Sequence, residues 1–401
     1  MFAKTLGAAM FMAVASMSAA SAEESKGDDQ AGLKDHLILN VRLRQEWVDQ
    51  AGFSKNAYAL TVRTRFGFET PRWKGFSVLV EGENVAHLTD EFNDTVNGLS
   101  AYPVVADPDA TELNRAQLSF TGSRNAEIVA GRQWLALDDE RFLGSVGFRQ
   151  NDQTFDAIKV STGQLAPVTI EYAYIDRVHR VFGDDHPLGE FDSSSHVIEA
   201  RKVSPIGTVA VYGLLLDFDN APALSSATYG ARLTGKHRGV AYRLEYARQE
   251  DYRSNPASFE LSYFRATADL VRERWTFGGG VEILGGDGAN AFQTPLATLH
   301  KFQGFADAFL STPSEGLRDF FIHAEYRWPQ TLFGGPVKLG VAAHDFQAEE
   351  GSADLGSEFD LLAGYEIARG LSFEAKAAFL DGGGAGPADR TKVWLVLTFD
   401  L

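Results

Sequence analysis

Two pairs of arginines are the first residues of this chain whose spacing suggests a chemical role. Arg42 and Arg44 lie two residues apart in segment 37–47, and Arg63 and Arg65 do so in segment 58–70. Successive side chains of a β-strand point to opposite faces, so each pair shares one face of its strand. Guanidinium groups stay charged and bind carboxylates through two parallel N–H donors. The spacing therefore predicts a basic surface that can bind anions.

Two carboxylates follow at the same spacing in the next segment. Glu81 and Glu83 alternate with apolar residues, and a turn separates them from the second arginine pair. A hairpin turning about residues 72–73 places Arg63 opposite Glu83 and Arg65 opposite Glu81. Oppositely charged residues that face each other across two strands stabilise the pairing. We therefore expect a ladder of Arg–Glu pairs on one face of this hairpin.

Arg115 extends the cluster on the following segment. Two interpretations remain open. The paired charges could brace one wall of a water-filled pore, or the surplus guanidinium groups could bind a passing anion, especially a carboxylate. The predicted pore-lining residues are Arg42, Arg44, Arg63, Arg65, Glu81, Glu83, Arg115, Arg132, Arg141 and Arg149.

The segment 138–152 combines both charge signs with glycine and large apolar residues. It could be a solvated surface loop. It could instead fold into the pore as a constriction, because Phe142, Leu143 and Phe148 favour burial. The acidic run 138–140 offers oxygen ligands for calcium, but it lacks the spacing of a known calcium loop. We expect no metal site and no cofactor.

Two other clusters could carry catalysis. His300 and Asp307 lie in a long insertion that is too apolar for a free loop, and a packed, hydrogen-bonded structural pair is the favoured interpretation. His196 follows the serines at 193–195, which is the nearest approach to a hydrolase triad. The chain has no G-x-S-x-G pattern of a strained nucleophile turn. We therefore expect that this protein is not an enzyme, and a barrel hydrolase is the alternative interpretation.

The elements that carry these residues are strands. Apolar and polar residues alternate in most of eighteen candidate strands, whereas segments 126–135 and 153–162 alternate poorly and their faces stay unassigned. The candidate strands are 37–47, 58–70, 76–85, 113–122, 126–135, 153–162, 167–176, 195–203, 208–217, 226–235, 240–249, 258–269, 274–284, 318–328, 337–346, 358–367, 371–380 and 391–401. Short and long connections alternate between them. This pattern is typical of an all-β transmembrane antiparallel barrel with short periplasmic turns and long extracellular loops.

The last segment points to the same class. Val393, Leu395, Leu397 and Phe399 share one apolar face that continues to the C-terminal Leu401. Such a strand can close a barrel by pairing with the first one, which leaves no open edge in lipid. Tryptophans near the turns, at 73, 275 and 328, and near the loops, at 47 and 134, are consistent with interfacial belts.

The N-terminal segment and the overall composition predict where in the cell the protein resides. Residues 1–22 combine a basic start, an apolar run and a small-x-small site, as in a secretory signal peptide, and 23–36 form a polar leader. Cysteine is absent, which excludes thiol catalysis, and the net charge of −17 argues against nucleic-acid binding. We predict a single barrel over 37–401 in the outer membrane, with both termini periplasmic.

Several strings resemble the alginate export family of outer-membrane porins. They are residues 131–133, 139–152, 154–156, 295–307, 312–313 and 316–319. The resemblance extends from about Leu37 to the C-terminus and implies an eighteen-stranded barrel that passes acidic polysaccharide through an arginine-lined pore. The short turn at 368–370 departs from the long periplasmic loop of alginate-secreting members.

The expected function is an outer-membrane channel for anionic solutes, with an acidic oligo- or polysaccharide such as alginate as the expected solute. The alternatives are a general or oligosaccharide-uptake porin without alginate specificity, the barrel hydrolase, and an adhesive barrel whose loops bind a partner. The expected partners are outer-membrane lipid, an anionic saccharide or other small anionic solute, and the outer-membrane insertion machinery.

Overall fold

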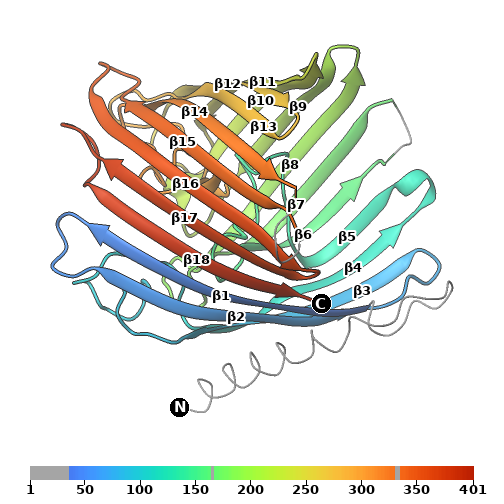
Figure 1. The fold of residues 1–401 in the computed structure, drawn as a ribbon. Coiled ribbons are helices and arrows are strands. Elements are labelled where there is room, and N and C mark those ends of the chain that lie inside the picture. Colours follow the sequence, from blue (N-terminus) through green and yellow to red (C-terminus); the bar gives the residue numbers. More distant parts are fainter. Residues whose placement is uncertain (1–35, 164–166, 330–334) are drawn as a thin grey trace.

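The computed structural model describes residues 36–163, 167–329 and 335–401, which form one closed antiparallel barrel (Figure 1). Each strand pairs with its neighbours in sequence, and β1 pairs with β18 to close the sheet. The strands are β1 (Leu37–Gln50), β2 (Ala57–Glu69), β3 (Phe76–His87), β4 (Ala110–Thr121), β5 (Glu127–Gln133), β6 (Thr154–Ser161), β7 (Thr169–His179), β8 (Glu190–Ser204), β9 (Gly207–Leu216), β10 (Ser226–His237), β11 (Val240–Asp251), β12 (Glu260–Arg272), β13 (Trp275–Leu284), β14 (Leu317–Trp328), β15 (Val337–Gln347), β16 (Asp354–Ala368), β17 (Leu371–Asp381) and β18 (Arg390–Asp400).

All eighteen predicted strands are therefore confirmed, and so is the barrel class. Short 3-10 helices lie in the connections, namely η2 (Ser123–Asn125), η3 (Pro222–Leu224) and η4 (Leu299–Lys301). Within the described residues no helix has the length and apolar character needed to span a membrane. The predicted signal peptide and nearly all of the predicted leader lie outside the described residues.

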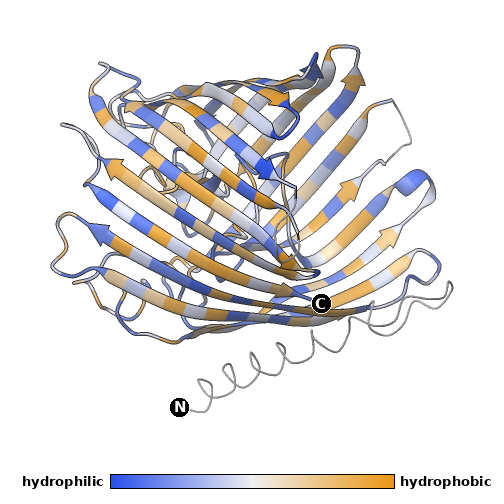
Figure 2. Ribbon diagram, in the orientation of Figure 1, coloured by the Kyte–Doolittle hydropathy of each residue, from blue (hydrophilic) through white to orange (hydrophobic). Residues whose placement is uncertain are grey.

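Hydropathy alternates along most of the strands, which have an apolar outer face and a more polar inner face (Figure 2). Large apolar side chains stay exposed on the outside. Examples are Ile322 on β14 and Val341 on the neighbouring strand β15. Charged residues of the strands on either side, such as Glu282 on β13 and Asp360 on β16, are buried inside. This inversion is what lipid around the barrel requires.

The connections confirm the predicted asymmetry. Turns such as those at 205–206, 238–239 and 369–370 join strands at one end, and the connections at 88–109, 134–153 and 285–316 join them at the other. The start of β1 and the end of β18 lie at the short-turn end, where the backbone N–H of Leu401 donates to the carbonyl of Leu39 at 3.0 Å.

The predicted register of the β2–β3 hairpin is wrong by two residues. Arg65 lies opposite Glu83, and Glu81 lies opposite Gly67. The cause is the turn, which sits at Lys74 and Gly75, with φ of 51° and 92°, rather than at 72–73. A two-residue turn of this kind needs positive φ at both positions. A shift of two keeps every side chain on its predicted face.

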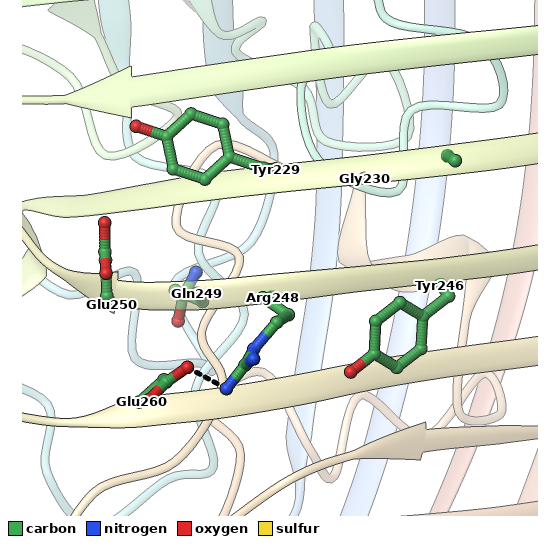
Figure 3. Close-up of a pocket in the computed structure, with 8 residues that line it drawn as sticks. Tyr229, Gly230, Tyr246, Arg248, Gln249, Glu250 and Glu260 are labelled. Atoms are coloured by element: carbon green, nitrogen blue, oxygen red, sulfur yellow. Dashed lines mark ion pairs between the residues drawn. The ribbon is translucent and has the colours of Figure 1, made fainter.

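Aromatic residues border the apolar band at both ends. Trp73, Trp275 and Trp328 are exposed beside the short turns. At the loop end, Tyr229 and Tyr246 line a shallow groove of about 440 Å³ on the outer face (Figure 3). The ion pair of Arg248 and Glu260 lines the same groove. Trp134 departs from this pattern, because its ring lies under the guanidinium group of Arg115, 3.7 Å from it.

Candidate functional site

The connection between β5 and β6, residues 134–153, lies inside the barrel and is called here the crossing loop. The two arginines of β1 hold one side of it through its backbone. Arg42 donates to the carbonyl of Gly147 at 2.7 Å and to the side chain of Gln150 at 2.9 Å. Arg44 donates to the carbonyl of Phe148 at 2.6 Å.

The other side of the crossing loop is held by the opposite wall. β10 lies halfway around the sheet from β1, and its Arg232 contacts Asp138 at 3.2 Å. Asp138 and Asp139 also pair with arginines of β11 and β12, at 2.6 Å for Arg243 and 2.7 Å for Arg265. The loop therefore spans the lumen. Two carboxylates of its acidic run, Asp138 and Asp139, pair with arginines of the barrel wall, and the third, Glu140, pairs with Lys301 of the connection between β13 and β14.

Arg141 is the deepest anchor of the crossing loop. Its Nε donates to Glu282 of β13 at 2.5 Å, and its Nη1 donates to Thr294 at 2.8 Å. Both partners of the ion pair are almost fully buried. The hydroxyl of Tyr263 also donates to Glu282, at 2.6 Å. Removing one partner from such a buried pair strands the other charge, so this contact fixes the loop strongly.

The insertion between β13 and β14, residues 285–316, also folds into the lumen, with Asp307 at its centre. Asp307 accepts hydrogen bonds from His300 at 2.8 Å, from Arg149 of the crossing loop at 3.1 Å and from Lys392 of β18 at 3.0 Å. All four side chains are buried. The pair His300–Asp307 thus has the packed structural role that the sequence favoured.

Burial sets the charge states of this pair. Burial lowers the pKa of His300 to about 4, against the opposing attraction of Asp307. Burial acts to raise the pKa of Asp307, but the ammonium of Lys392 and the neighbouring imidazole outweigh it and hold the pKa of that carboxyl well below its ordinary value. At neutral pH, therefore, a neutral imidazole and an ionised carboxylate face each other.

Apolar residues of both loops pack together inside the lumen. Phe142 contacts the rings of Tyr212, Tyr263 and Phe292 at centroid distances of 5.2 to 6.1 Å. Phe148 stacks on His300 with centroids 3.4 Å apart. These contacts join both loops to the wall in one buried cluster. The constriction interpretation of segment 138–152 is therefore the one that the structure supports.

Two neighbouring cavities, which share Lys301 in their linings, lie along the wall formed by β14 to β18 and β1. One, of about 360 Å³, is lined by four cationic side chains, Arg42, Arg44, Lys301 and Lys376, and two carboxylates, Glu140 and Glu374. The other, of about 280 Å³, shares Lys301 and continues past His323, Lys338 and His344. The cavity beside β1 therefore carries a positive excess.

The predicted arginine cluster is assembled, but its members are engaged. Arg65 pairs with Glu83 at 2.6 Å and also with Asp152 of the crossing loop. Arg63 approaches the same carboxylates at 3.9 and 3.8 Å. Arg44 pairs with Glu46 at 2.8 Å and with Asp107. Among the described residues, Arg42 is the member of this cluster that contacts no carboxylate.

The remaining predicted site residues lie apart from that cluster or at its edge. Arg115 forms a two-pronged pair with Glu81, at 3.0 and 2.7 Å. Arg132 pairs with Asp156 at 2.9 Å near the loop end of β5, in register with Ala116 and on the outward-facing side of the sheet. The structure therefore does not bring Arg132 to the lumen cluster.

The serine–histidine cluster is not assembled. The Oγ atoms of Ser193 and Ser195 lie 2.7 Å apart on the buried inner side. His196 points the other way, because neighbouring residues of a strand alternate, and its Nδ1 lies 2.8 Å from the hydroxyl of Tyr172. The hydrolase alternative thereby loses the contact on which it depended.

Comparison with known proteins places the fold. No family model and no curated protein matches the chain. Solved structures do match along nearly their whole length. Pseudomonas aeruginosa OccK9 (OpdG) is 14% identical with a TM-score of 0.70, and the match covers 92% of this chain and 100% of the OccK9 chain. Acinetobacter baumannii OccAB4 is 14% identical with a TM-score of 0.69, and the match covers 91% of this chain and 98% of the OccAB4 chain.

The outer-membrane protein OpdK of P. aeruginosa is similar to the same degree, at 14% identity and a TM-score of 0.68, covering 92% of this chain and 100% of its own. The fold is that of an outer-membrane barrel. The expected membership of the alginate export family is wrong, since the similar solved structures are Occ-type barrels. Short strings shared along lumen loops did not carry a family relationship.

Sequence reasoning missed two lysines and several carboxylates that line the cavities or anchor the loops. Lys301 lies in the insertion, where no periodicity indicates which side chains face the lumen. Lys376 and Glu282 lie on the inner face of predicted strands, so their alternation was the available signal. Asp107, which pairs with Arg44, lies in the irregular connection 88–109 and had no such signal.

Proposed function

We propose that this protein is an outer-membrane channel of the uptake-porin type for small anionic solutes. One observation carries the proposal: the cavity left beside the crossing loop has four cationic side chains against two carboxylates. Long, closed barrels with a polar interior suit passive diffusion of solutes. Rings or clusters of Arg and Lys at a constriction favour anions.

The chemical class of the solute follows from the donors. Lys301 and Lys376 present ammonium groups, Arg42 adds a guanidinium without a carboxylate partner, and Phe148 offers a ring 5.0 Å from Lys376. A small carboxylate with an apolar body matches these groups. A solved structure of P. aeruginosa OpdK with vanillate, a carboxylate of this kind, has a TM-score of 0.67 to this chain at 13% identity. It supports the same solute class.

The proposal includes the orientation of the barrel in the outer membrane and the way in which it is inserted there. Both termini would face the periplasm, because the short turns and the ends of β1 and β18 lie together. The apolar outer face of β18 would be the element that the outer-membrane insertion machinery recognises.

Ion selectivity in planar bilayers tests the proposal. Under a salt gradient the unmodified protein should prefer anions, and the preference should fall in Lys301→Gln and Lys376→Gln. Lys55→Gln is the matched control, since Lys55 lies in the loop after β1 against Tyr102 and does not line the cavity. Cation preference in the unmodified protein, or equal loss in the control, would contradict it.

A further inference from the structure

Both ring nitrogens of His179, at the loop end of β7, face carboxylates. Nδ1 lies 2.8 Å from Oε1 of Glu190 at the start of β8, and Nε2 lies 2.9 Å from Oδ2 of Asp156 on β6. The imidazole is buried, with 8% of the side chain exposed. A neutral imidazole carries one N–H, so it can donate to only one of these two carboxylates. The other nitrogen then presents its lone pair to an oxygen, and that contact needs a cation, either a proton or a metal ion.

The contact with Asp156 has the form of a support for a metal ligand. Arg132 holds Asp156 in place, because its Nε and Nη2 donate to the two carboxylate oxygens at 2.9 and 3.2 Å. A carboxylate fixed in this way favours the proton on Nε2 of His179 and leaves the lone pair of Nδ1 facing Glu190. Histidines that ligate metals almost always donate their other N–H to such a group. His179 is therefore oriented as a ligand.

Asp184 completes a set of three ligand atoms. One oxygen of Asp184, one of Glu190 and a ring nitrogen of His179 lie within 4.8 Å of one another. Asp184 is exposed in the connection 180–189, where its backbone N–H donates to Glu112 of β4 at 3.3 Å. Ligand atoms about 2.1 Å from one metal ion lie roughly 3.0 to 3.4 Å apart. A small movement of Glu190 away from His179 therefore makes room for an ion.

The charge of this region also favours a cation. Within the described part of the chain, two arginines, Arg132 and Arg177, pair with carboxylates of this group. The carboxylates outnumber them, so the region keeps a negative excess that attracts a divalent ion. They are Glu112, Asp156, Asp184, Glu190 and Asp192.

We propose that His179, Asp184 and Glu190 bind a divalent transition-metal ion of the zinc class. One imidazole nitrogen with two carboxylates suits Zn²⁺, whereas Ca²⁺ and Mg²⁺ take oxygen ligands. The ion joins the end of β7, the start of β8 and the connection between them, and so fixes residues 180–189 at the loop end of the barrel. None of the three ligands lines the two lumen cavities, so the site does not depend on the proposed transport function.

Calorimetric titration with zinc chloride tests the site in the untagged, chelator-treated protein in micelles. The unmodified protein should bind one Zn²⁺ per chain. Asp184→Asn should lower the affinity at least about tenfold, since the loss of a supporting carboxylate alone costs that much. Asp185→Asn is the matched control, because Asp185 is exposed in the same connection and lies outside the ligand set. The control should bind like the unmodified protein. Absence of binding, or equal affinity in Asp184→Asn and Asp185→Asn, would overturn the proposal.

Limited proteolysis separates the metal ion from a proton. If a proton fills the contact instead, His179 is an imidazolium that bridges Asp156 and Glu190, and zinc has no effect on the connection. With a metal site, Zn²⁺ should slow tryptic cleavage after Arg180 in the unmodified protein, because a bound ion stabilises the folded connection. His179→Gln should show no such protection, whatever its cleavage rate without metal. Cleavage of the unmodified protein that zinc leaves unchanged would reject the metal site.

Discussion

The contact between Arg141 and Glu282 should decide whether the crossing loop stays in the lumen. Arg141→Met keeps most of the side-chain length and the packing against Phe302, whose ring lies 4.9 Å from the guanidinium carbon. It removes the only loop cation bonded to Glu282, which stays buried on β13. The loop then has to move, or Glu282 has to remain without its partner.

The size of the effect follows from what remains around Glu282. Removing one partner of a buried ion pair costs about 3–5 kcal/mol. Arg265 of β12 still attracts Glu282, and Tyr263 still donates to it, so the lower end applies. A cost of about 3 kcal/mol shifts the ratio of loop-in to loop-out states by roughly a hundredfold, since about 1.4 kcal/mol corresponds to a factor of ten.

Single-channel recording in planar bilayers measures this shift. We expect Arg141→Met to show larger or more frequently interrupted conductance levels than the unmodified protein, because the loop samples positions away from the wall. Combining it with Glu282→Gln should restore most of the original behaviour, because the stranded charge is gone. If Arg141→Met conducts like the unmodified protein, or if the double variant is more disturbed than the single one, the anchoring argument is refuted.

Two further outcomes follow from the lipid face and from the buried histidine. Val341→Lys on the lipid face should lower the free energy of unfolding by about 2–4 kcal/mol, measured by guanidinium titration in vesicles, whereas Ala342→Lys on the inner face should cost clearly less; equal costs would contradict the assignment of faces. Since the pKa of His300, about 4, lies below its ordinary value of 6.5, its contribution to stability is complete above about pH 6.5 and is lost as the pH falls towards 4. Proteolysis of the insertion should therefore increase in that acid range and not in His300→Phe; no increase in the unmodified protein would contradict it.

Most of the strands were predictable because lipid on one side and water on the other impose a period of two, although segments 126–135 and 153–162 alternate poorly. Alternation places Arg42, Arg63 and Glu83 on the inner face without any knowledge of their partners. Register was harder, because it depends on which turn residues adopt positive φ. Lys74 and Gly75 do so here, and they move Arg65 by two positions to Glu83.

The loops were predictable only in part. Apolar residues of segment 138–152 indicated burial, and Phe142 is indeed packed inside the barrel. Which wall they would meet depends on contacts between residues far apart in sequence, such as Arg141 with Glu282 or Arg149 with Asp307. No local pattern encodes such pairs, so the partners of the arginine cluster could not be derived before the structure.

Because the loops fold into the lumen, the buried arginines of the cluster hold the crossing loop in place as well as carrying positive charge. A substitution of Arg44 would release the carbonyl of Phe148 and strand Asp107, so it would disturb the crossing loop before it changed the charge that a solute meets. Lys301 is about half exposed in the cavity, and its ion pair with Glu140, at 2.8 Å, is open to water. Exposed pairs contribute little to stability, so Lys301 can exchange its partner for a passing carboxylate at small cost. Selectivity and loop position are therefore separable in this barrel: lysines of the open cavity should govern the first, and buried arginines of β1 and the crossing loop the second.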